Sequence, residues 1–213
     1  MKLKVQDLGL ILWLVMVKMN KLLMNKKVVN IINDCSNLNY ALNDNEMLIV
    51  NYYANNQKDI NVNIEQTSNS YFVLNFSCLI KDDCRVNIHG NVTGDDNRCV
   101  INVRCLSEKN TGTFDVIVKV NENTQNNEII EDLKGINEDG SVIFLPVLEI
   151  DTNEVDAEHF ATIGNFDKNE LFYLQTKGIS LESAYKLLKK SFIYSLFSDE
   201  FMKLLNEGKE KDE

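Results

Sequence analysis

The stretch that decides the fold is residues 99–120, which read CVINVRCLSEKNTGTFDVIVKV. Apolar residues occupy every second position in both halves of this stretch, and polar residues fill many of the positions between them. This alternation predicts two strands with one buried and one wetter face, because successive side chains of a strand point to opposite sides. The polar Asn110-Thr111-Gly112 between the halves predicts a turn.

The same pattern extends in both directions, over residues 47–150, with strand centres about every 12 to 15 residues. The chain has only one proline and nine glycines. Asparagine is abundant and tolerates left-handed backbone, so we expect it to form many of the turns. Short, regular strands with polar turns are compatible with a sandwich, a barrel or a β-solenoid, and the pattern alone does not choose among them.

The period of the pattern changes near the C-terminus, where helices are predicted. Asp167 and Glu170 form a capping-box pair, and Gly178 stands where a helix C-cap favours a left-handed residue. Ser180 is expected to open a second helix and Ser198 a short third one. We therefore predict a mostly β protein with a small C-terminal α-helical appendage.

The chain divides into four predicted parts: an N-terminal extension at 1–24, a β body at 25–165, a helical domain at 166–206 and a charged tail at 207–213. Residues 8–17 form an apolar run that is too short for a membrane span, which needs about 20 residues. The extension is interpreted either as an upstream segment outside the fold or as a short element on the body. Membrane contact is the less favoured alternative.

Composition excludes several classes of function. The chain has 213 residues, a net charge of −10 and a pI near 4.8, which disfavours binding to nucleic acid and to anionic membranes. The sequence has no phosphate-binding loop, no nucleophile elbow and no metal-binding histidine pair. We therefore do not expect an enzyme.

The five cysteines include no CxxC pair, which is typical of a reduced cytoplasmic protein. Alternation places Cys78, Cys99 and Cys105 on the buried faces of their strands. Cys35 and Cys84 lie in polar turn sequences and are expected to be more accessible.

A family resemblance appears over roughly residues 113–197. The matching residues are Leu148-Glu149-Ile150, Glu158-His159, Ala161-Thr162, Gly164, Leu171-Phe172-Tyr173-Leu174 and Gly178-Ile179. In this order and spacing they resemble the C-terminal signature of the SufB/SufD family, the scaffold proteins of the SUF iron–sulfur cluster assembly system. This resemblance, and not the strand pattern, implies a right-handed parallel β-helix.

The resemblance also implies a function and partners. Family members act in a complex with a SufC-type ATPase, and the other subunit would be SufB-type or a second copy of this chain. Residues 128–135 contain no cysteine where a SufB-type protein would have one, so the chain looks SufD-like. The alternative is a shortened β-solenoid interaction module without cluster binding.

The resemblance assigns the cluster-related role to His159, with Glu158 as a possible acceptor beside it. His159 would contribute to a transient iron–sulfur cluster shared with a partner. The other interpretation is a packed structural histidine, because His159 shares its strand face with apolar residues. Phe160 replaces the usual glycine, which puts the local geometry in question.

The helical tail is the predicted docking surface for the SufC-type ATPase. Its apolar stripe includes Tyr185, Leu188 and Phe192. Such a stripe is suited to a helix-in-groove contact, and it is equally suited to packing on the end of the β body. His89 is expected to be an outward-facing surface residue.

Overall fold

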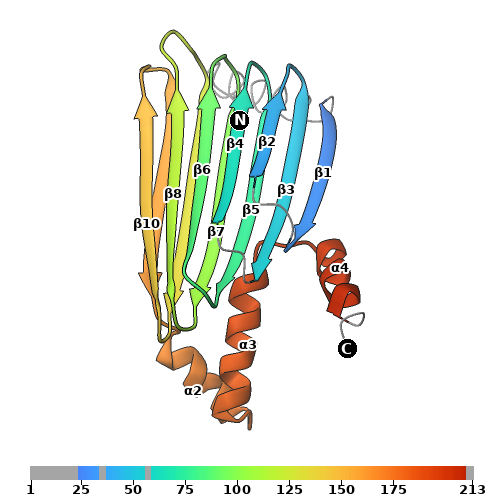
Figure 1. Ribbon diagram of the computed structural model, residues 1–213, viewed down its shortest axis with the longest axis vertical. Helices are drawn as coiled ribbons and strands as arrows, with labels where there is room; N and C mark the ends of the chain where they lie inside the picture. The colour runs from blue at the N-terminus through green and yellow to red at the C-terminus, as the bar shows by residue number, and fades with distance from the viewer. Residues whose placement is uncertain (1–23, 34–36, 56–58, 210–213) are drawn as a thin grey trace, which may run out of the picture.

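The computed structural model describes residues 24–33, 37–55 and 59–209 (Figure 1). Residues 1–23, which make up nearly all of the predicted N-terminal extension, lie outside the described residues. So do Cys35 and residues 210–213 of the predicted charged tail.

The body of the molecule is a pair of parallel β-sheets wound into a solenoid of about five turns. The strands of adjacent coils pair in parallel, residue by residue and without interruption. This parallel pairing excludes the antiparallel sandwich, which the alternation pattern had left open. The six-stranded sheet runs in the order β1 (Asn25–Ile32), β3 (Glu46–Asn55), β5 (Tyr71–Ile80), β7 (Arg98–Ser107), β9 (Asn127–Asn137) and β11 (Val155–Gly164). The five-stranded sheet runs in the order β10 (Ser141–Ile150), β8 (Thr111–Val120), β6 (Cys84–Val92), β4 (Asp59–Gln66) and β2 (Asn37–Leu42).

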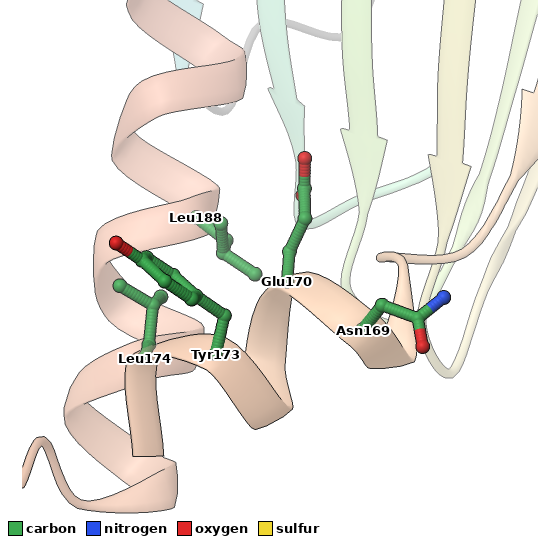
Figure 2. Close-up of a pocket in the computed structure, with 5 residues that line it drawn as sticks. All are labelled: Asn169, Glu170, Tyr173, Leu174 and Leu188. Carbon is green, nitrogen blue, oxygen red and sulfur yellow. The ribbon is translucent and has the colours of Figure 1, made fainter. Parts of the chain in front are cut away.

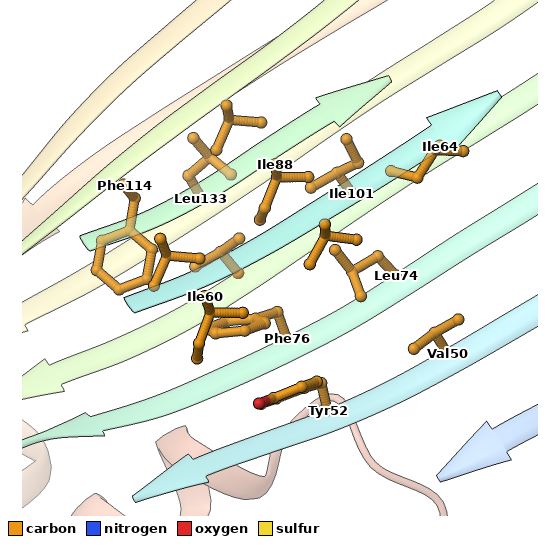
Figure 3. Close-up of a cluster of buried hydrophobic side chains, with 14 of the residues drawn as sticks. Val50, Tyr52, Ile60, Ile64, Leu74, Phe76, Ile88, Ile101, Phe114 and Leu133 are labelled. Carbon is orange, nitrogen blue, oxygen red and sulfur yellow. The ribbon is translucent and has the colours of Figure 1, made fainter. Parts of the chain in front are cut away.

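The space between the two sheets is filled by the inward-facing residues of every strand (Figure 3). An aromatic row runs through it: Phe76 stacks on Tyr52 at 5.1 Å between ring centroids and meets the edge of Phe114 at 6.2 Å. The predicted parallel β-helix with its buried strand faces is thus confirmed.

The cysteine predictions are partly confirmed. Cys78, Cys99 and Cys105 are fully buried in the interior, as alternation predicted. The prediction of an accessible Cys84 is wrong, because this residue begins β6 rather than lying in the preceding turn, and its side chain turns inward.

Asparagine has two structural roles. At the turns, Asn45 and Asn69 adopt positive φ angles of 62° and 48°, which confirms the expected use of asparagine in left-handed backbone. On the outer face of the six-stranded sheet, asparagines of successive coils form a hydrogen-bonded row. Its bonds are 2.9, 2.9 and 3.0 Å long and join Asn30, Asn51, Asn75 and Asn102. Such rows help to fix the register between coils.

Three helices follow the last strand: α2 (Lys168–Thr176), α3 (Leu181–Tyr194) and α4 (Asp199–Lys209). The Asp167 carboxylate caps α2 by accepting from the Asn169 amide at 2.8 Å, and Ser180 caps α3. Gly178 has a φ of +82° just beyond α2, as its predicted C-cap position requires. No helix among the described residues is long and apolar enough to cross a membrane.

The helices gather at one end of the strands (Figure 1). α3 is fixed to the outer face of the six-stranded sheet, where the Ser77 hydroxyl donates to the Ile193 carbonyl at 2.6 Å. Lys189 lies 2.6 Å from Glu138 and 3.4 Å from Glu108, which ties α3 to two turns of the body. A second hydrophobic cluster forms beneath these contacts, from Tyr53, Leu106, Ile136, Ile193, Phe201 and Leu205.

Candidate functional site

His159 lies on the last strand of the six-stranded sheet. In the part of the chain that the structure describes, β11 pairs only with β9 in this sheet, and the register places His159 directly beside Glu131. Val155 and Ala157, two positions apart on the same face of β11, pack against the core. His159 therefore points to the interior side of the terminal coil, as its alternation predicted.

Glu131 is an acidic residue inside the solenoid. Its side chain is 0% exposed, whereas that of His159 is 35% exposed, and the His159 Nδ1 lies 3.1 Å from the Glu131 Oε2. Burial raises the pKa of the Glu131 carboxyl from 4.5 to about 8. Neither carboxyl oxygen has an aligned hydrogen-bond donor among the described residues. The pair therefore joins a desolvated carboxyl group to an imidazole that solvent or a partner can reach.

The residue adjacent in sequence, Glu158, has a different position. It is exposed and lies on the opposite face of β11 from His159, because neighbouring strand residues alternate. The carboxyl group beside the imidazole is thus Glu131, which the sequence reasoning missed. One signal was present: Glu131 shares an alternation face with Ile129 and Leu133, which flank it and are both apolar and buried.

Phe160 does not disturb this geometry. It is 53% exposed on the outer face, where it borders a shallow hollow with Ile130 and Thr162. β11 pairs with β9 without interruption from Val155 to Gly164. Phe160, in place of the usual glycine, therefore leaves the strand regular, and its side chain does not enter the interior of the solenoid.

The His159–Glu131 pair is not a complete metal site. Within the described part of the chain, no three side chains from His, Cys, Asp and Glu converge to hold a metal ion. Iron–sulfur clusters are usually held by about four ligands. The described residues alone therefore do not supply the ligand set of a cluster.

The second candidate surface lies on α2 and α3. Leu188 borders a hollow between the two helices together with Tyr173 and Leu174 (Figure 2). Tyr185 is partly exposed and its ring packs edge-on against Phe166 at 6.2 Å. The three predicted docking residues therefore differ in their surroundings, because Phe192 packs half-buried against the second hydrophobic cluster.

Additional apolar residues extend this surface beyond the predicted ones. Phe172 is 67% exposed on α2, and further large apolar side chains of α2 and α3 are exposed, namely Tyr173, Leu181 and Leu187. An exposed group of this kind is typical of a protein-interaction surface. Phe172 and Leu187 are better probes of docking than Phe192, whose replacement would also disturb internal packing.

Comparison with known proteins places the chain in a family. The model for the SufBD core domain of SUF-system iron–sulfur cluster assembly matches residues 54–192. The chain belongs to the SufBD family. A SufBD family iron–sulfur cluster assembly protein from Mycobacterium leprae is 44% identical over 55 residues, which is 25% of this chain and 14% of that relative. The match to this relative thus spans a small part of its length.

The SufBD match covers both candidate surfaces. It begins near the end of β3 and ends in α3, so it includes the His159–Glu131 pair, all of α2 and most of α3. β1 and β2 lie outside it. Membership of the SufBD family supports a role in SUF iron–sulfur cluster assembly.

Proposed function

We propose that this chain is a SufD-like, non-enzymatic component of a SUF assembly complex, in which His159 contributes one ligand to a nascent iron–sulfur cluster. The observation that carries the proposal is the accessible imidazole of His159 held beside the buried Glu131 on the terminal coil. Family membership supplies the context, because the matched region contains this pair.

The geometry suits a histidine that binds iron through one nitrogen. The 3.1 Å separation puts Nδ1–H within reach of Oε2. A small rotation of the imidazole would align the two for a hydrogen bond when Glu131 is ionised. The lone pair of the imidazole then resides on Nε2, the other ring nitrogen. A carboxylate in this position orients the ring and raises its basicity as a metal ligand. Glu131 thus takes the orienting role that adjacency in sequence had suggested for Glu158.

The remaining ligands would come from another subunit. Among the described residues, no further strand follows β11, which carries His159, so this edge of the terminal coil is open to a partner. The partner would be a SufB-type subunit that supplies cysteine thiolates, or a second copy of this chain. The cluster would be bound transiently and shared between the two subunits. Its iron and sulfide would be carried by the complex and would not be a permanent cofactor.

Replacing His159 with alanine tests this role. We expect the reconstituted complex to yield several-fold less cluster, measured by its visible absorbance, while the subunits still co-purify. His89→Ala is the matched control, because His89 is the only other histidine and is exposed on the outer face of β6. Undiminished cluster yield from His159→Ala, with a lowered melting temperature, would identify His159 as a structural residue.

Docking of a SufC-type ATPase would use the apolar surface of α2 and α3. Phe172→Ala is expected to weaken this complex about 30-fold, which corresponds to about 2 kcal/mol for an aromatic interface anchor. Leu145→Ala is the control, because Leu145 is similarly apolar and exposed but lies on β10. Affinities from calorimetry that are equal for both variants would contradict docking through α2.

A second candidate function is a β-solenoid interaction module that binds no cluster. The observation in its favour is the incomplete ligand set among the described residues. The two functions differ in one outcome: an interaction module would form the same complex and yield no His159-dependent cluster.

A further inference from the structure

The helix pair α2–α3 differs in charge from the rest of the molecule. Residues 165–195, which contain both helices, include five lysines and three acidic residues, so this segment has a net charge of +2. The whole chain has a net charge of −10, so the remainder carries −12. The exposed apolar side chains of the two helices therefore lie in a basic segment of an acidic protein.

Lysines accompany these apolar side chains at helical spacing. Phe172 follows Lys168 by four positions in α2, and Lys190 follows Leu187 by three positions in α3. Residues three or four positions apart lie on the same side of a helix. Phe172 is 67% exposed and Leu187 49%, and both lysines are exposed as well. Each of the two apolar side chains thus has an ammonium group one turn away.

A third pair repeats this arrangement with a direct contact. The Lys177 ammonium lies 5.2 Å from the centre of the Tyr173 ring. The same ring borders the hollow between α2 and α3 (Figure 2). A cation over the face of an aromatic ring is attracted by the charge distribution of the ring. Lys177 is therefore held beside the apolar surface.

These three lysines are available to a partner, whereas the other charges of the segment are mostly engaged. Lys186 lies 2.6 Å from Glu182, and Lys189 ties α3 to the body through its two carboxylate contacts. Asp167 caps α2, which leaves Glu170 as the acidic residue at the hollow. Within the described ranges, no carboxylate forms an ion pair with the three lysines beside the apolar side chains.

We infer that the α2–α3 surface recognises a protein partner whose apolar patch is edged by carboxylates. The inference rests on the docking role proposed above and adds the chemistry of the partner. The partner's apolar patch would cover the exposed side chains of the two helices, and its carboxylates would pair with the three lysines. Charges at the rim of an interface mainly raise the rate of association and exclude partners of the wrong charge.

An anionic membrane is the less suitable occupant of this surface. Aromatic and aliphatic side chains with lysines beside them also occur on helices that lie on lipid surfaces. A membrane is an extended negative surface, however, and it would repel the charge of −12 on the remainder of the chain. A protein partner that contacts only the helix pair avoids this repulsion.

Two synthetic helical peptides test the charge preference. They share one face of leucines, and the flanking positions are glutamate in the first peptide and lysine in the second. We expect the full chain to bind the glutamate peptide at least about tenfold more tightly, measured by fluorescence anisotropy. The net charge of −10 would give the opposite preference if binding were not local. Equal affinities, a preference for the lysine peptide, or binding only to phosphatidylserine vesicles would overturn the inference.

Charge-reversal variants locate the preference on the helices. Lys168→Glu combined with Lys190→Glu should remove the preference for the glutamate peptide, whereas Lys26→Glu on β1 should retain it. Lys177 is kept, because a glutamate at the C-cap of α2 would oppose the helix dipole. Circular dichroism checks that the variants fold. An unchanged preference in the double variant would show that the lysines do not select the partner.

Binding of a SufC-type ATPase separates this inference from the proposed function. The double variant should bind the ATPase about tenfold more weakly than the wild-type chain at about 0.05 M salt, and nearly equally at about 0.5 M, where charges are screened. If Phe172→Ala weakens this complex and the double variant does not, docking is retained and the role of the lysines is refuted. If the wild-type chain binds the glutamate peptide but not the ATPase, the inference is retained and the proposed partner is wrong.

Discussion

The Glu131→Gln variant is expected to be more stable than the wild-type chain at pH 9 and similar in stability at pH 4. Burial raises the folded-state pKa of Glu131 from 4.5 to about 8. The folded wild-type chain therefore binds one more proton than the unfolded chain between these values. The free energy of unfolding is highest below pH 4.5, where the carboxyl is neutral in both states. It falls as the pH rises through 8, by on the order of 5 kcal/mol in total.

Urea unfolding at several pH values measures this difference. The neighbouring titratable groups are His159, at 3.1 Å, and Cys99, whose pKa is raised to about 12 by burial and then by the Glu131 charge. Glu128→Gln is the control, because it removes a negative charge from the outer face of the same strand. An unchanged pH slope in Glu131→Gln would mean that water or a counter-charge reaches the carboxylate in the folded chain.

The Phe76→Ala variant is expected to lose about 3–5 kcal/mol of unfolding free energy, because it leaves a cavity between the sheets. Phe76 is fully buried and contacts both Tyr52 and Phe114 in the aromatic row (Figure 3). Phe172→Ala makes the same chemical change on an exposed residue and should alter stability by less than about 0.5 kcal/mol. Chemical denaturation measures the free energy of unfolding of both variants. An equal loss in the two would mean that Phe76 contributes no more to the core than the exposed Phe172.

Strand positions could be predicted from the sequence, but the solenoid could not. Alternation reports which face of a strand is buried, and it is the same for parallel and antiparallel pairing. A solenoid usually shows a repeat of fixed length in its sequence, but the coils of this chain differ in length. Successive members of the asparagine row are separated by 21, 24 and 27 residues. These unequal spacings hide the repeat, so the architecture depended on the resemblance to the SufB/SufD family.

The candidate site was predicted in part, for a related reason. The motif located His159, but its neighbour Glu131 lies one coil earlier, 28 positions away, and register decides which residues of two coils meet. Without the register, the adjacent Glu158 was the natural choice. Cys84 was misplaced similarly, because the polar Lys81-Asp82-Asp83 before it suggested a turn that in fact ends one residue earlier.

The asparagine row gives the solenoid an electrical polarity. Each amide nitrogen in the row donates toward the preceding coil: Asn102 to Asn75, Asn75 to Asn51 and Asn51 to Asn30. The five-stranded sheet repeats this direction, since Asn87 donates to Asn61. Amide dipoles aligned in this way add along the axis, with their oxygen ends directed toward the later coils. Each row therefore has its negative pole on the side that faces the later strands, β9 and β11 in one sheet and β8 and β10 in the other.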